Sequence, residues 1–202
     1  MMKLLKFLER LLPLAFFVFV VFAFDTPRLA LFTLAAAVIH ESGHVLFGAS
    51  RKIVHLLPSP HPTGFRITPK RSISYKDELI LLIGGPVSNI IVFFLSFFTF
   101  YITKKESFFD FAFVNFLTAF ANLLPIKGYD GYRITETAIL IKKGDAFDKI
   151  SHLSHLSFAF TAILTFLSLY LLLKLGEGYW IFALFFASTV YDLKKLIETG
   201  NF

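Results

Sequence analysis

Long apolar segments separated by short polar ones dominate this chain. A helix rises about 1.5 Å per residue, so about 20 apolar residues cross the hydrocarbon core of a bilayer. The pattern therefore predicts an all-α polytopic membrane protein with about six transmembrane helices. The six apolar segments are residues 11–24, 29–47, 79–102, 108–125, 153–173 and 179–190.

The first segment has an alternative interpretation, because it is short for a membrane span. Lys3, Lys6 and Arg10 precede it, as basic residues precede the apolar core of a signal peptide. No A-x-A cleavage site follows near Phe24. We therefore expect a retained, uncleaved helix.

Residues 51–78 break the apolar pattern and do not form a span. Short runs at 65–68 and 72–75 alternate with prolines, which predicts short strands or extended chain between the second and third helices. A plain connecting loop is the alternative. The prolines are Pro58, Pro60, Pro62 and Pro69. No repeat or linker marks a second domain, so residues 1–202 are expected to form one membrane domain.

Composition supports the membrane interpretation. Hydrophobic residues make up 56% of the chain, compared with about 45–50% in an average soluble domain, and the mean hydropathy is +0.70. Cysteine is absent, which excludes disulfides and thiolate ligands. Any metal site must then use nitrogen and oxygen ligands, a set that suits catalytic zinc.

The net charge of +6 fits basic cytoplasmic loops better than a nucleic-acid partner. With the N-terminus in the cytoplasm and six crossings of the membrane, the basic residues divide unevenly between the two sides. The non-cytoplasmic side then receives four basic residues, and the remaining 16 of the 20 fall on the cytoplasmic side. Such a bias predicts cytoplasmic N- and C-termini. The four are Arg28, Lys104, Lys105 and Lys174.

The candidate chemistry lies in the second apolar segment, in the sequence His40-Glu41-Ser42-Gly43-His44. Residues four apart share a helix face, so His40 and His44 can bind one metal ion. Glu41 lies beside them, where a carboxylate can serve as a general base. Ionisable groups are costly in an apolar segment, which favours a functional role over chance.

A hydrolytic zinc site usually has three protein ligands. The third histidine of the HExxHxxGxxH pattern is missing here. Glu136 is one candidate, and Asp130 is a better one because Pro125 and Gly128 should interrupt the fourth apolar segment just before it. An Asp in a turn or helix cap is the structural alternative for Asp130.

The expected depths of the candidate ligands agree. The second segment runs toward the cytoplasm, and His40 lies about 16 Å along it from Leu29. The fourth segment runs the same way, and Asp130 follows its end. Both can therefore meet in the cytoplasmic half of the bilayer.

Three motifs together resemble the site-2 protease family of intramembrane zinc metalloproteases. They are HESGH, then GGPVSN at 84–89, then NLLPIKGYDG at 122–131, in that family's order across residues 29–133. The compact form is most similar to the branch that contains the sporulation protease which matures a late sigma factor. Leu123 stands where many members have Pro, and Tyr132 where a second Gly is frequent.

The resemblance implies one Zn²⁺ per chain, held by His40, His44 and Asp130, with Glu41 as catalytic base. It also implies a membrane-protein substrate cleaved within or near its transmembrane segment, release of a regulatory factor, and a bacterial cell membrane. A membrane regulatory partner is also expected from this resemblance. The chain is too short for the PDZ or CBS domains of some relatives.

Several alternatives stay open at this point. Asn89 and Asn122 are expected either to donate hydrogen bonds to the substrate or oxyanion, or to join helices. A strand within 51–78 is expected to pair with an unwound substrate. The chain could instead be a non-proteolytic zinc-binding scaffold or transporter, or an anchored protease for soluble peptides. Glu41 favours a protease, since a scaffold needs no base.

Overall fold

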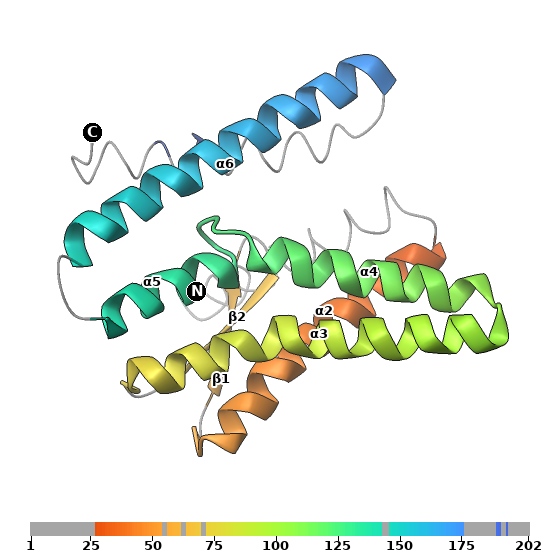
Figure 1. The fold of residues 1–202 in the computed structure, drawn as a ribbon, viewed down its shortest axis with the longest axis horizontal. Coiled ribbons are helices and arrows are strands. Elements are labelled where there is room, and N and C mark those ends of the chain that lie inside the picture. The colour runs from red at the N-terminus through yellow and green to blue at the C-terminus, as the bar shows by residue number, and fades with distance from the viewer. Residues whose placement is uncertain are drawn as a thin grey trace, which may run out of the picture. The chain divides into compact units, whose positions relative to one another are not determined.

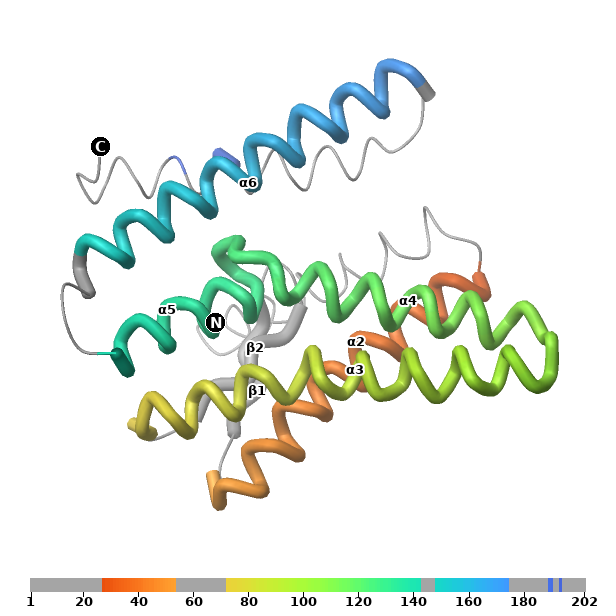
Figure 2. The backbone as a smooth tube through the Cα atoms, viewed as in Figure 1, coloured from red at the N-terminus to blue at the C-terminus, as the bar shows by residue number. Residues whose placement is uncertain are grey.

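The computed structural model describes residues 27–53, 56–61, 64–69, 72–142, 146–175, 189–190 and 193. Figures 1 and 2 show that helices dominate it. The elements are α2 (Pro27–Ser50), β1 (Leu56–His61), β2 (Gly64–Pro69), α3 (Tyr75–Thr103), α4 (Glu106–Leu123), α5 (Asp130–Ile141) and α6 (Ala146–Leu175). The predicted segment 11–24 and nearly all of 179–190 lie outside the described residues.

Three of the described helices are long and apolar enough to cross a membrane. They are Pro27–Ser50, Tyr75–Thr103 and Asp148–Lys174, and they overlap the predicted segments at 29–47, 79–102 and 153–173. A mostly helical membrane protein is thus confirmed, and the total of six spans stays a prediction. Many large apolar side chains are exposed on these helices, as expected of surfaces that face lipid.

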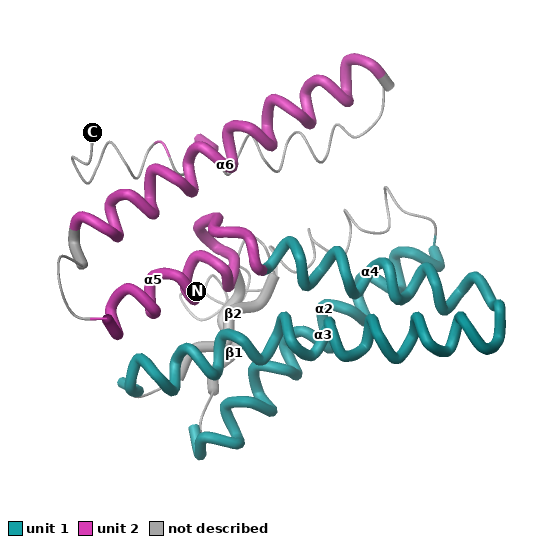
Figure 3. Tube along the Cα trace, viewed as in Figure 1, with its two compact units in different colours: residues 1–122 teal, residues 123–202 magenta. Residues whose placement is uncertain are grey.

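The chain divides into two compact units, residues 1–122 and residues 123–202 (Figure 3). In the first unit α2 and α3 pack closely at two glycines. A Cβ on Gly84 would lie 2.6 Å from the carbonyl oxygen of Gly43, and a Cβ on Gly43 would clash with the carbonyl oxygen of Gly84. The absence of both side chains lets the two backbones approach, as small residues do between membrane helices.

Helices α3 and α4 form an antiparallel hairpin with an aromatic contact surface. The side chain of Ser74 caps the start of α3 by accepting the Asp77 N–H, and Lys104 ends the helix with a left-handed φ of 56°. Phe93 contacts Phe116 and Phe100 contacts Phe109, each pair with ring centroids 5.4 Å apart. These contacts hold α4 beside α3.

An ion pair between Arg28 and Asp110 joins the beginnings of α2 and α4. Both helices therefore start at the same end of the first unit. This is the parallel orientation expected when α2 and α4 cross a membrane in the same direction.

The strands β1 and β2 lie within residues 51–78 and pair antiparallel, from Leu56 with Pro69 to His61 with Gly64. Strand β2 also contacts α2. Pro58 and Pro60 lie in β1, and proline is tolerated in a strand that forms the edge of a sheet.

The predicted break near Pro125 and Gly128 is confirmed. Helix α4 ends at Leu123 and α5 begins at Asp130, and Gly128 between them has a φ of 98° that favours glycine. In the second unit the Lys127 N–H donates to Ser157 Oγ of α6 over 2.8 Å. The hydroxyl of Tyr132 lies 3.1 Å from Ser154 Oγ, which ties α5 to α6.

Candidate metal centre

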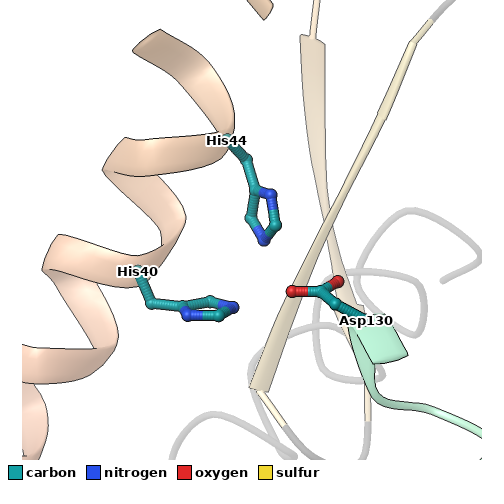
Figure 4. Close-up of side chains that lie close together, drawn as sticks. All are labelled: His40, His44 and Asp130. Carbon is teal, nitrogen blue, oxygen red and sulfur yellow. The ribbon is translucent and has the colours of Figure 1, made fainter. Parts of the chain in front are cut away.

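His40 and His44 lie on the buried face of α2, one turn apart. Their exposed fractions are only 5% and 6%, and their rings meet edge to face with centroids 4.9 Å apart. Their ligand atoms lie within 4.8 Å of each other. Figure 4 shows both rings projecting from the same side of the helix. The i, i+4 spacing thus gives the predicted histidine pair.

The orientation of the His44 ring is fixed by the backbone of α3. His44 Nδ1 lies 2.8 Å from the carbonyl oxygen of Leu81. A carbonyl oxygen can only accept, so Nδ1 carries the hydrogen and donates it. The neutral ring then bears its lone pair on Nε2, the form in which histidine binds a metal.

The His40 ring is fixed in the same tautomer by a side chain. Its Nδ1 lies 2.8 Å from Oδ1 of Asn89. The amide nitrogen of Asn89 donates to the carbonyl oxygen of Ala36 over 3.0 Å and to Oδ1 of Asn115 over 2.9 Å. Its oxygen must therefore face His40 and accept from Nδ1, which again leaves the lone pair on Nε2.

Gly85 of α3 borders both Nε2 atoms. A Cβ built on this residue would lie 2.6 Å from Nε2 of His40 and 2.6 Å from Nε2 of His44. Because glycine has no Cβ, residue 85 does not fill this space beside the two Nε2 atoms. Two Nε2 lone pairs beside a space that a methyl group would fill are a good fit for a metal ion with nitrogen ligands, such as zinc.

Glu41 follows His40 directly on α2. Its side chain is half-buried and its Oε2 atom is buried. A carboxylate next to two histidines that donate from Nδ1 is the group that this segment offers for proton transfer.

Asp130, the third side chain labelled in Figure 4, belongs to the second unit. It is the first residue of α5 and is half-buried, as is Glu136, which lies six residues further along the helix. A carboxylate at the first turn of a helix is stabilised by the helix dipole. Burial raises the pKa of the neighbouring Tyr129 hydroxyl.

Comparison with known proteins gives a match among solved structures. No protein-family model matches the chain, and no curated protein sequence does. Among solved structures it is similar to the site-2 protease from Methanocaldococcus jannaschii, with a TM-score of 0.58 and 18% identity over 91% of this chain and 86% of that one. The chain has the fold of a site-2 protease. At this identity the likeness concerns the fold, and it agrees with a membrane protein.

Within this site-2 protease fold, the structure favours the helix-joining alternative for Asn89. The residue is fully buried, and both of its amide hydrogens are donated inside the protein. No amide hydrogen of Asn89 is left to bind an oxyanion, so the expected oxyanion role does not fit this residue. Asn122 donates to the Thr118 carbonyl oxygen of its own helix over 2.9 Å, and its role stays a prediction.

The sequence interpretation missed the contribution of α3 to the histidine pair. Leu81, Gly85 and Asn89 are spaced by four residues, which places them along one face of the helix. The first orients His44, the second leaves space at both Nε2 atoms, and the third orients His40. The regular spacing is a signal that could have revealed this face.

Proposed function

We propose that the chain is an intramembrane zinc metalloendopeptidase that cleaves membrane-tethered substrates within or near their transmembrane segment. The observation that carries this proposal is the pair of buried histidines. Each donates from Nδ1 to an oxygen acceptor of α3, and both Nε2 atoms border the space at Gly85. The site-2 protease fold and the three apolar helices are consistent with it.

His40, His44 and Asp130 are the proposed ligands of one Zn²⁺. Two histidines and one aspartate supply three ligand atoms, which is the number that leaves a zinc ion an open position. The chain has no cysteine, so nitrogen and oxygen ligands are the available set. Zinc held by such ligands activates water and polarises a carbonyl group.

Glu41 is the proposed catalytic base. Its carboxylate takes up the proton that the attacking water loses and returns it to the leaving amine. Asn122 is proposed to donate to the substrate, since it is a half-buried amide on α4. Glu41 also argues against a zinc scaffold or transporter, which would need no base beside its ligands.

The membrane setting constrains the substrate. A transmembrane helix has its carbonyl groups already bonded, so it must unwind before a base and a metal can act on a peptide bond. We propose that the unwound stretch pairs with a strand of the β1–β2 hairpin, as peptides add to sheet edges.

The basic-residue bias supports cytoplasmic termini. The resemblance to the compact sporulation branch supports a bacterial membrane, a membrane regulatory partner, and a regulatory protein such as a sigma or anti-sigma factor as the released product.

Two single substitutions, compared with wild type, test the proposed function. Wild type and Glu41→Gln are each expressed in cells, with Glu106→Gln, an exposed glutamate at the start of α4, as matched control. We expect Glu41→Gln to keep its zinc, measured on the purified protein, and to make one or more membrane proteins accumulate uncut. Glu106→Gln should behave as wild type. Cleavage retained by Glu41→Gln would refute the assignment.

A further inference from the structure

Asn115 is a fully buried amide in the middle of the apolar helix α4. Its Nδ2 donates to the carbonyl oxygen of Phe111 over 2.9 Å, one turn earlier on the same helix. Its Oδ1 accepts from Asn89 of α3 over 2.9 Å. A buried amide is costly unless it is hydrogen-bonded, so this arrangement must be satisfied as a whole.

The direction of each bond follows from fixed backbone acceptors. The Phe111 carbonyl can only accept, so the nitrogen of Asn115 faces it and the oxygen of Asn115 faces Asn89. The nitrogen of Asn89 then meets two acceptors, Asn115 Oδ1 and the Ala36 carbonyl oxygen. If the Asn89 amide were turned over, its oxygen would face both acceptors.

We propose that Asn115 is a positioning residue for His40, acting through Asn89. We call this chain of side chains, Asn115–Asn89–His40, the amide relay. It keeps the oxygen of Asn89 toward His40, holds the hydrogen of His40 on Nδ1, and so keeps the lone pair on Nε2 for a metal. This inference rests on the proposed metal site. The hydrogen bonds that the structure describes for the Asn115 side chain go to Asn89 and Phe111, and neither partner is a histidine.

The two histidines differ in a way that makes the inference testable. His44 is oriented by a backbone carbonyl, that of Leu81, which no side-chain substitution removes. His40 is oriented by an amide that can turn over. Weakening the relay should therefore disturb His40 and leave the tautomer of His44 unchanged.

The test compares three variants. Asn115→Leu removes one of the two acceptors of the Asn89 amide nitrogen, and the Ala36 carbonyl oxygen remains. Asn115→Asp retains one, because a carboxyl group buried in an apolar helix is protonated and then presents one O–H and one carbonyl oxygen, as the amide presents N–H and C=O. Thr118→Val is the control on the same helix, since its hydroxyl donates only to Val114 of α4 among the contacts described.

Two readouts are taken on purified protein without substrate. The first is affinity for Zn²⁺, and for Co²⁺ by its absorption spectrum. The second is the tautomer of His40 in metal-free protein, from nitrogen NMR of labelled histidine. Loss of a partner behind a ligating histidine typically weakens metal binding by about 10- to 100-fold.

For Asn115→Leu we expect about a 10-fold loss of metal affinity and a mixture of His40 tautomers. Asn115→Asp and Thr118→Val should stay within about 2-fold of wild type, the usual scatter of independent sites. If Asn115→Leu does not fold, Asn115→Ala removes the same acceptor with less bulk. Wild-type affinity and a single His40 tautomer in whichever variant folds would overturn the relay.

A double-substitution cycle separates the relay from general packing. Once Asn89→Leu has removed the contact with His40, Asn115→Leu should cause no further loss of affinity beyond about 2-fold. Additive losses would mean that Asn115 acts through packing, and the relay would be wrong. Failure of the proposed function looks different, because the wild type itself would then bind no metal.

Discussion

Substitution of Gly85 by alanine is the sharpest test of the metal site. The new Cβ would lie 2.6 Å from Nε2 of both His40 and His44, closer than carbon and nitrogen approach without a bond. The two histidine rings must turn away from the new methyl group, and this breaks their Nδ1 hydrogen bonds to Asn89 and Leu81. At about 1 kcal/mol for each neutral hydrogen bond, the loss is about 2 kcal/mol.

Where the metal-bound form bears this cost, it corresponds to about a 30-fold loss of metal affinity. Crowding of the helix interface adds a further cost, typically about 1–3 kcal/mol, that appears in the stability of the metal-free protein. The assay is a Zn²⁺ or Co²⁺ titration of purified protein, combined with thermal unfolding without metal.

The matched comparison is Gly84→Ala. This adds the same methyl group one residue earlier, where it would meet Gly43 and Phe47 and no ring nitrogen. Both variants should unfold at lower temperature than wild type, and Gly85→Ala should lose distinctly more metal affinity. Wild-type affinity in Gly85→Ala, or equal losses in the two variants, would refute the reasoning.

Three further predictions follow from the proposed site and orientation. Asp130→Ala should lower the zinc content while Glu136→Ala leaves it unchanged, measured by metal analysis of purified protein; unchanged metal in Asp130→Ala would move the third ligand elsewhere. Ile67→Pro should reduce cleavage by removing a strand N–H from β2, while Ile67→Val should not, and equal cleavage by both variants would exclude strand pairing. A reporter fused after Phe202 should be active in the cytoplasm, and activity on the other side would contradict six spans.

The histidine pair was predictable because it depends on one helix. The four-residue spacing of His40 and His44 places them on one face wherever the helix lies, and the break between α4 and α5 follows from Pro125 and Gly128. Such features need only local backbone geometry. The apolar segments likewise predict helices that match α2, α3 and α6.

The roles of Gly85, Asn89 and Asn115 were not predictable in the same way. The position of Gly85 beside both Nε2 atoms depends on how α2 crosses α3. The direction of the Asn89 amide depends on acceptors from α2 and α4 together. These are tertiary properties, and a motif on one helix does not contain them.

The apolar surroundings themselves explain why both histidines have a fixed tautomer. On a solvated helix, water can bond Nδ1 in any ring orientation. At a buried position in an apolar helix, an unbonded Nδ1 would be costly, so each ring needs an acceptor from the protein. The i, i+4 spacing on α2 presents both rings to α3, and residues 81 and 89, two turns apart on that helix, provide the two acceptors. Both histidines therefore form their hydrogen bonds at Nδ1. As a result, both Nε2 lone pairs face the space beside Gly85.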